Sequence, residues 1–346
     1  MVVAEADPAI AAGGSITRWW LVATVALTLS AICAGVLLAP PESSRVGPAL
    51  TSLLFLGASV HVGSTAWFYG VPAVRCHMWR NPKRYLVVPA VLVVATVAAV
   101  LLVPRSWVPV GLLAFFAWQF FHFQKQNLGV AAIAARATGS PSLVPSERRA
   151  IVLAGCGGTA ALVGRPELLR IAEAPEVPGL FAVGVAVFAA AAGYGVVAVL
   201  SRTPTGRSPA FLVVYLTSLL FFAPVFLFDS PYAAVAGITI AHGLQYLLLM
   251  GLLAAAPNET GARSVVGVLV LVNVAVVVGL GLSQASHFHE AHGWTRAFYG
   301  IYLGLVMSHF VIDAGLWRLR DEFPRAFLTQ RLPGLLARRS TPALAE

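Results

Sequence analysis

The sequence predicts an all-α protein, a polytopic integral membrane helical bundle with nine or ten transmembrane helices. Three observations support this prediction. The first is composition: 58% of the 346 residues are hydrophobic and only 11% are charged, whereas about a quarter of a soluble domain is charged. The second is the recurrence of apolar runs of about 20 residues, the length that crosses a bilayer as a helix. The third is the proline, glycine and short charged loops that separate these runs.

Ten apolar runs are candidate spans. They cover residues 19–39, 49–70, 85–104, 107–135, 150–164, 178–200, 209–228, 231–255, 264–283 and 294–317. The fifth run is short and contains Gly155, Gly157 and Gly158, so nine spans with a tilted or re-entrant fifth segment are the alternative. Together the runs define one transmembrane domain over residues 19–317.

The two ends of the chain differ from the spans. Residues 1–18 are mostly small and polar, and they predict a disordered cytoplasmic leader. Residues 318–346 alternate arginine with leucine, phenylalanine and proline. This pattern predicts a basic cytoplasmic tail that lies on the inner leaflet.

The distribution of positive charge predicts the orientation. With ten spans and a cytoplasmic N-terminus, 17 of the 23 lysines and arginines fall in cytoplasmic segments, 5 fall in outer segments, and Lys125 falls within a span. This bias supports cytoplasmic N- and C-termini. The net charge of +9 is therefore interpreted as topogenic charge that also attracts anionic lipid, and no nucleic-acid partner is expected.

Several common kinds of site are not indicated. The three cysteines, Cys33, Cys76 and Cys156, lack CxxC spacing, so neither a disulfide framework nor a thiolate metal site is expected. The chain also has no glycine-rich phosphate loop, GxSxG elbow or HExxH motif. Polar residues inside the spans remain as the functional candidates, because such residues are costly in a bilayer.

Four histidines lie near the middle of predicted spans, one in each: His61, His122, His242 and His309. In the proposed topology these four spans run in the same direction. At a rise of about 1.5 Å per residue, the four imidazoles lie at the same depth to within roughly one helical turn. We therefore expect them to meet if their helices are neighbours, and we predict a shared metal site.

Each of these histidines has polar neighbours about one turn away on the same helical face. They are Ser64 and Thr65 near His61; Gln119, Lys125, Gln126 and Asn127 near His122; Gln245 and Tyr246 near His242; and Asp313 near His309. We predict catalytic or substrate-positioning roles for Lys125, Gln126, Gln245 and Asp313. The others are candidates for orienting the imidazoles. Ordinary interhelical hydrogen bonds, and snorkelling of Lys125 and Asp313, are the alternatives.

Neutral imidazoles without thiolates suit iron, copper or zinc. Zinc would favour hydrolysis through a bound hydroxide, whereas iron would favour oxygen chemistry on an apolar substrate that enters from the lipid. Aromatic residues cluster near the histidines in the sequence and indicate such a substrate, although they are also common helix-packing residues. They are Trp67, Phe68, Phe120, Phe121, Phe123, Tyr246, Tyr302 and Phe310.

The other four histidines lie outside the middle of the predicted spans. His77 lies in a basic loop and is expected to be solvated. His287, His289 and His292, together with Glu290, form an H-x-H-E-x-H cluster on the predicted outer side. This spacing can bind a transition metal, so the cluster is the second candidate metal site.

The run His309-Phe310-Val311-Ile312-Asp313 resembles the H-F-x-x-D element of the Brp/Blh family of bacterial membrane β-carotene dioxygenases. The resemblance implies an iron ion held by His61, His122, His242 and His309, cleavage of an isoprenoid chain by oxygen, and a bacterial plasma membrane location. The chain departs from the family after His61, where Val62-Gly63 replaces the start of a His-Gly-x-x-Asp element. The run from Gln124 to Asn127 also has no counterpart in the family pattern.

The leading hypothesis is a membrane-embedded, histidine-ligated metalloenzyme, an iron oxygenase acting on an isoprenoid or other lipid-soluble substrate. One alternative is a proton-coupled or small-solute transporter that uses the same polar layer. Another is a haem-binding membrane protein, although bis-histidine haem sites usually place both histidines on one helix. The sequence leaves the substrate, the metal and the oligomeric state open.

Overall fold

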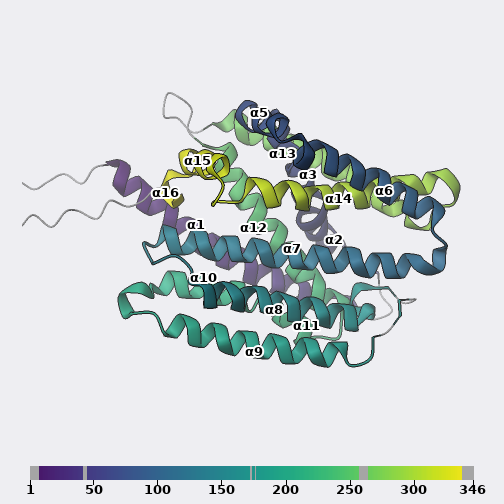
Figure 1. The fold of residues 1–346 in the computed structure, drawn as a ribbon, viewed down its shortest axis with the longest axis horizontal. Helices are drawn as coiled ribbons and strands as arrows, with labels where there is room; N and C mark the ends of the chain where they lie inside the picture. The colour runs from purple at the N-terminus through teal and green to yellow at the C-terminus, as the bar shows by residue number, and fades with distance from the viewer. Residues whose placement is uncertain (1–7, 42–44, 172–173, 176, 257–263, 337–346) are drawn as a thin grey trace, which may run out of the picture.

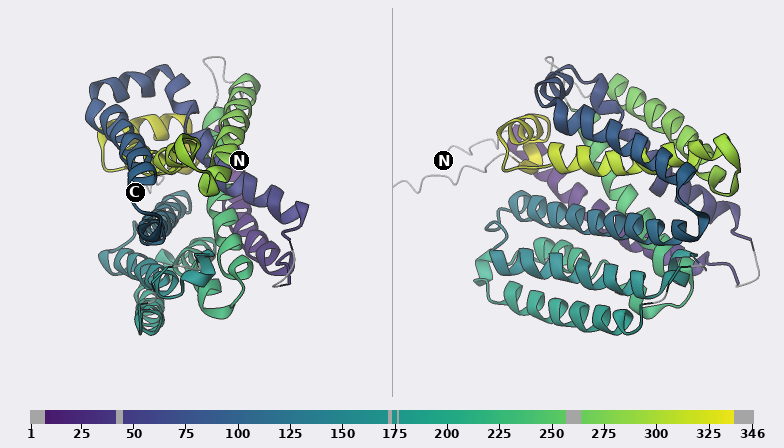
Figure 2. Two further views of the ribbon diagram at one scale, coloured as in Figure 1. Left: turned by 90° about the vertical axis from the view of Figure 1, so that its right-hand side faces the viewer. Right: turned by 45° about the vertical axis from the view of Figure 1, so that its right-hand side comes forward.

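The chain folds as a bundle of helices (Figure 1), and no strand occurs among the residues that the structure describes. The structure is a computed structural model that describes residues 8–41, 45–171, 174–175, 177–256 and 264–336. Figure 2 shows the bundle from two further sides. The predicted fold class, an all-α polytopic helical bundle, is confirmed.

The first half of the chain forms the helices α1 to α8. Their bounds are α1 Pro8–Leu37, α2 Pro48–Leu54, α3 His61–Ser64, α4 Trp67–Gly70, α5 Pro72–Arg80, α6 Val88–Leu102, α7 Val108–Ala137 and α8 Pro145–Gly164. Two π-helical segments, η1 (Phe55–Val60) and η2 (Lys83–Val87), lead into α3 and α6, and a short 3-10 turn, η3 (Arg105–Trp107), precedes α7. Prolines begin α2, α5 and α8, because the first turn of a helix does not need their missing N–H.

The second half of the chain forms the helices α9 to α16. Their bounds are α9 Leu180–Leu200, α10 Pro209–Leu219, α11 Ala223–Leu227, α12 Gly237–Ala254, α13 Val265–Ser286, α14 Ala297–Leu316, α15 Glu322–Arg331 and α16 Pro333–Leu336. A third π-helical segment, η6 (Tyr232–Ala236), leads into α12. The 3-10 turns are η4 Pro166–Leu169, η5 Pro204–Gly206, η7 His287–Glu290 and η8 Gly293–Arg296.

All ten predicted spans are helical, but they differ in length, hydropathy and continuity. Among the described residues, eight helical segments are long and apolar enough to cross a membrane. The predicted fifth span is α8, a helix of 20 residues. The predicted seventh is broken into α10 and α11 at Leu220–Phe222. The count of nine or ten therefore depends on these two segments.

Gly157 of α8 and Gly184 of α9 allow these two helices to pack closely. A Cβ on Gly157 would lie 2.6 Å from the backbone nitrogen of Phe188. A Cβ on Gly184 of α9 would likewise lie 2.6 Å from the nitrogen of Ala161. Such contacts let two backbones approach closely inside a membrane. Of the three glycines that weaken the hydropathy of the fifth span, Gly157 allows its close packing on α9, whereas Gly155 faces Gln124 of α7 and Gly158 faces Phe222.

The N-terminal segment differs in part from the predicted disordered leader. Helix α1 begins at Pro8, so residues 8–18 are helical, whereas residues 1–7 lie outside the described part of the chain. The start of α1 and the helices α15 and α16 lie at the same end of the bundle (Figure 1). The hydroxyl of Thr17 donates a hydrogen bond to the carbonyl of Gly334 there, at 2.5 Å.

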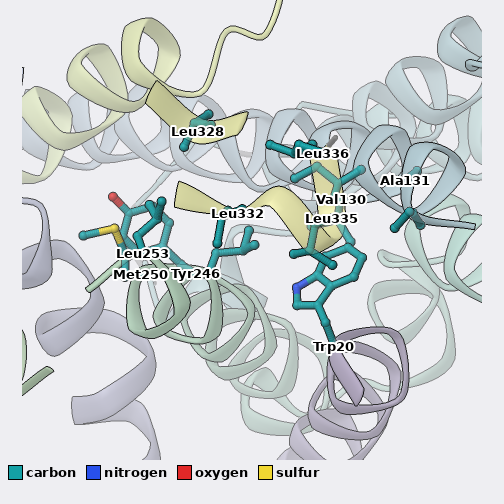
Figure 3. Packing of buried hydrophobic residues seen from close by; sticks show 14 of the residues in the cluster. Trp20, Val130, Ala131, Tyr246, Met250, Leu253, Leu328, Leu332, Leu335 and Leu336 are labelled. Atoms are coloured by element: carbon teal, nitrogen blue, oxygen red, sulfur yellow. The ribbon is translucent and has the colours of Figure 1, made fainter. Parts of the chain in front are cut away.

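The predicted basic tail is partly built into the bundle. Figure 3 shows Leu335 and Leu336 beside Trp20 of α1 and Val130 of α7. Leu332 packs in the same cluster, next to Met250 and Leu253 of α12. The apolar residues that alternate with arginine therefore face the bundle and cover its end, although they were predicted to lie on the leaflet. Residues 337–346 are outside the described chain.

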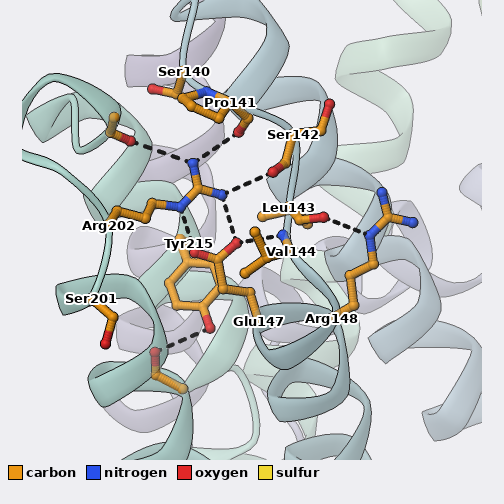
Figure 4. Close-up of polar contacts among 12 residues, drawn as sticks. Ser140, Pro141, Ser142, Leu143, Val144, Glu147, Arg148, Ser201, Arg202 and Tyr215 are labelled. Atoms are coloured by element: carbon orange, nitrogen blue, oxygen red, sulfur yellow. Dashed lines mark hydrogen bonds and ion pairs between the residues drawn. The ribbon is translucent and has the colours of Figure 1, made fainter.

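A buried ion pair fixes the loops between α7 and α8 and between α9 and α10 (Figure 4). Arg202 Nη2 donates to Glu147 Oε2 at 2.6 Å, and Arg202 Nη1 donates to the carbonyl of Pro141 at 2.8 Å. The same carboxylate oxygen accepts the backbone N–H of Val144 at 3.0 Å, which caps α8. The side chains of Arg202 and Glu147 are only 6% and 0% exposed.

We expect Arg202→Met to destabilise the fold strongly, because it leaves the Glu147 carboxylate buried without its cation. Removing one partner of a buried pair costs about 3–5 kcal/mol. The matched control is Arg165→Met. Arg165 pairs with Glu167 and Asp229, which are 56% and 92% exposed, so its loss is expected to cost less than about 1 kcal/mol. Denaturant unfolding of the purified protein measures both, and equal effects would contradict this assignment.

Candidate metal centre

The four mid-span histidines lie on four different helices: His61 begins α3, His122 lies in α7, His242 in α12 and His309 in α14. Two of these helices follow π-helical segments, since η1 ends just before His61 and η6 ends just before α12. π-helical turns are rare and occur frequently at functional sites. Irregular helix geometry therefore directly precedes His61 and directly precedes the helix that carries His242.

The π-helical segment η1 and helix α12 approach closely at a glycine contact beside two of the histidines. A Cβ on Gly243 would lie 2.2 Å from the carbonyl oxygen of Gly57, and a Cβ on Gly57 would lie 2.5 Å from the Cα of Ile240. Only glycine permits so close an approach. Because Gly243 follows His242, and Gly57 lies one turn before His61, this contact brings the two imidazoles together.

Each of the four imidazoles contacts two of the others, so that together they form a closed circuit. The imidazole centroids are 4.9 Å apart for His61 and His242, and 5.2 Å apart for His242 and His122. The imidazole centroid of His309 lies 5.1 Å from those of both His122 and His61 and completes the circuit. Two imidazoles bound to one ion by bonds of about 2 Å have their ring centroids roughly 5 Å apart. The spacing therefore fits shared ligation.

The ring nitrogens are available for a ligand. The Nε2 atoms of all four histidines are buried and have no hydrogen-bond partner among the described residues, and the same holds for the Nδ1 atoms of His61 and His242. Buried polar atoms normally have a partner. One ligand atom from each of His61, His242 and His309 lies within 4.8 Å of the others, and the same is true of His122, His309 and Asp313. The chain thus has a buried histidine cluster that can bind a metal ion.

A hydrogen-bonded group orients His309. Its Nδ1 atom is 2.7 Å from the hydroxyl of Thr65 and 3.6 Å from Oδ2 of Asp313. The hydroxyl of Tyr246 donates to Oδ1 of Asp313 at 2.8 Å and is 3.2 Å from the hydroxyl of Thr65. With Nδ1 engaged in this way, Nε2 is left for the ion. A partner of this kind fixes the tautomer and orientation of a metal-binding histidine.

The two predicted glutamines bind each other and the helix backbone. Gln126 Nε2 donates to the carbonyl of His242 at 2.9 Å and to Oε1 of Gln245 at 3.2 Å. Gln245 Nε2 donates in turn to the hydroxyl of Thr28 in α1 at 2.8 Å. Neither glutamine contacts an imidazole through these bonds. They connect the backbone beside His242 to α1.

Four other predicted site residues form no hydrogen bond with the ring nitrogens in the described part of the chain. Ser64 donates to the carbonyl of His61, and Asn127 donates to the carbonyl of Phe123. Gln119 is half-buried and Lys125 is exposed, and neither forms a hydrogen bond with another described residue. The predicted catalytic role of Lys125 stays a prediction.

Aromatic rings wall the cluster. Phe123 stacks on His242 at 3.9 Å between ring centroids, and Phe310 stacks on His122 at 4.6 Å. Trp118, which was not predicted as a site residue, contacts Phe310 at 5.7 Å and is partly exposed. The histidine cluster is thus enclosed by apolar surface on the side of these rings.

The remaining histidines lie elsewhere. His287 and His289 are exposed, and each directs Nδ1 at a backbone carbonyl. Among the described residues, the external H-x-H-E-x-H cluster does not converge as a metal-binding group, so it is not supported as a second site. His77, expected to be solvated, stacks on Phe323 of α15 at 4.0 Å. Its partial burial lowers the pKa of the imidazole.

Sequence reasoning missed the contacts that cross between helices. Thr65 was selected as a neighbour of His61, but it binds His309 of α14. Thr28 of α1 was not selected at all, because a lone threonine in an apolar run is ordinary. The only signal available was the spacing of Thr17, Trp20, Thr24 and Thr28 along one face of α1.

Comparison of the chain with protein-family models, curated proteins and solved structures finds no match. The resemblance of the run from His309 to Asp313 to the Brp/Blh family therefore stays a prediction. A proposal for the function therefore depends on the geometry of the histidine cluster.

Proposed function

We propose that this chain is a membrane-embedded iron oxygenase that acts on a lipid-soluble substrate, with an isoprenoid as the leading class. One observation carries the proposal: four imidazoles from four helices meet in the bundle with their Nε2 atoms buried and unpaired. The resemblance of His309-Phe310-Val311-Ile312-Asp313 to the Brp/Blh element supports iron in particular.

In this proposal His61, His122, His242 and His309 hold the iron ion, which supplies oxygen activation when bound. Other transition metals also suit imidazole ligands, so the choice of iron rests on the resemblance and on the apolar surroundings. A haem is less favoured, since each imidazole already contacts two others at about 5 Å and a bis-histidine haem needs a flat macrocycle between two rings.

The residues around the ion would divide three tasks. Thr65 and Asp313 hold Nδ1 of His309, so that its Nε2 faces the ion, and Tyr246 holds Asp313 in turn. Phe123 and Phe310 keep the imidazoles of His242 and His122 in place by stacking. The helices α15 and α16 cover one end of the bundle and limit entry of bulk water. An apolar site that is closed to bulk water suits a reactive oxidation and an apolar substrate.

The experiment is an oxygen-consumption assay on detergent-purified protein loaded with ferrous iron. With β-carotene as a test polyene, we expect oxygen uptake matched by loss of the polyene, and carbonyl products that carry the isotope when labelled oxygen gas is used. His309→Ala is the inactive control. If the iron-loaded wild type consumes no oxygen with β-carotene or a shorter isoprenoid, the oxygenase assignment is wrong.

The second candidate function is a transporter, and one observation favours it. The predicted seventh span is interrupted at Leu220–Phe222, between α10 and α11. Interrupted helices are common in transporters, and the sequence alone indicated none. Substrate-dependent flux through reconstituted liposomes, unaffected by metal chelation, would favour this function over the oxygenase.

A further inference from the structure

The inner face of α1 carries a column of polar residues that the proposed function does not use. Thr17, Trp20, Thr24 and Thr28 follow one another at intervals of three or four residues, which places them on one helical face. All four side chains are buried. A lipid-facing or purely apolar helix contact has no need for four such groups in a row, so the column calls for a partner inside the bundle.

At one end the column joins the histidine cluster through hydrogen bonds that all run in one direction. Gln126 donates to Gln245, and Gln245 donates to Thr28 at 2.8 Å. Thr28 donates to the carbonyl of Thr24 at 2.7 Å. Gln126 lies one turn after His122, and Gln245 lies three residues after His242. Aligned hydrogen bonds polarise one another in the low dielectric of a bundle.

The middle of the column has two unpaired polar atoms. The indole Nε1 of Trp20 and the hydroxyl of Thr24 are buried and have no hydrogen-bond partner in the part of the chain that the structure describes. Leaving such a group unsatisfied costs about 1–3 kcal/mol, and buried water is the usual partner where several polar groups converge. The two residues are one helical turn apart, so a water molecule can bridge them.

At its other end the column reaches the end of the bundle under α16. Thr17 donates to the carbonyl of Gly334 in α16, and the ring of Trp20 lies beside Leu335 and Leu336 (Figure 3). The column therefore extends from the covered end of the bundle, along α1, to the glutamines beside two of the histidines.

We propose that this face of α1 holds a file of water molecules that links the end of the bundle under α16 to the histidine cluster. Trp20 and Thr24 bind the waters in the middle of the file, and Thr28, Gln245 and Gln126 connect the file to the site. The file provides the route by which water and protons reach the buried centre. That role rests on the proposed function, whereas the presence of the water file does not.

X-ray radiolytic footprinting of the full-length protein in detergent tests the proposal, because hydroxyl radicals formed from bound water oxidise adjacent side chains. Trp67 is the internal control: it is 6% exposed, against 1% for Trp20, so bulk access alone predicts slower oxidation of Trp20. We expect the opposite order, with Trp20 oxidised several-fold faster. Mass spectrometry of the peptides reads both rates, and protection of Trp20 equal to that of Trp67 would overturn the proposal.

A pair of variants ties the effect to the column. Thr24→Val removes the hydroxyl with little change of shape and is expected to slow oxidation of Trp20 several-fold, whereas Thr24→Ser keeps the hydroxyl and the fast rate. An unchanged rate in Thr24→Val would show that the column is only interhelical hydrogen bonding. The measurement needs no bound metal, so its outcome is independent of the oxygenase assay.

Discussion

Replacement of His242 by alanine is expected to abolish metal binding. His242 is fully buried, both of its ring nitrogens are unpaired, and its ring contacts those of His61 and His122. Loss of an outer-shell partner alone typically lowers metal affinity about 10–100-fold, and loss of a ligand is expected to exceed that. Elemental analysis of detergent-purified protein should therefore find about one transition-metal ion per chain in the wild type and a trace in His242→Ala.

The matched controls are histidines outside the cluster. His77→Ala and His292→Ala are expected to keep the metal content of the wild type, because neither residue belongs to the metal-binding groups found among the described residues. The prediction fails if the wild type purifies without metal under conditions that preserve the fold. It also fails if His122→Ala retains the wild-type content. The same measurement identifies the element, which decides between iron, copper and zinc.

The depth of the site could be predicted from sequence, because depth in a membrane follows from distance along a helix. His61, His122, His242 and His309 each lie about half-way along an apolar run. A helix that runs through a bilayer fixes the depth of each of its residues at about 1.5 Å per position. Helical periodicity likewise placed Asp313 one turn beyond His309, where the structure has it.

The lateral arrangement of the helices could not be predicted, because it depends on which backbones approach one another. The pairing of Thr65 with His309, and of Gln245 with Thr28, joins residues more than 200 positions apart. The packing of the arginine-rich segment after Arg318 could not be predicted either, because it also depends on a contact with distant parts of the chain. Its apolar residues suit either a leaflet or a bundle, and only the presence of Trp20 and Val130 at the end of the bundle decides between them.

The glycine contact between Gly57 and Gly243 provides the second large prediction. An alanine at position 243 places its Cβ 2.2 Å from the carbonyl oxygen and 2.5 Å from the Cα of Gly57. These are backbone atoms, so no side-chain rotation relieves the clash and the two helices must separate. Overpacking of this kind typically costs about 1–3 kcal/mol. Because His242 and His61 lie on the separating segments, Gly243→Ala should also loosen the metal centre.

The control is Gly251→Ala on the same helix, where an added Cβ meets nothing within 4 Å. That variant is expected to keep the wild-type metal content and to change stability by less than about 1 kcal/mol, in the stabilising direction, because alanine favours helix over glycine. Thermal unfolding and elemental analysis of the two variants side by side separate the possible outcomes. If Gly243→Ala loses stability but keeps its metal, the glycine contact supports the fold without setting the spacing of the imidazoles. If it loses its metal while remaining folded, the close approach of η1 and α12 is what allows His61 and His242 to share an ion.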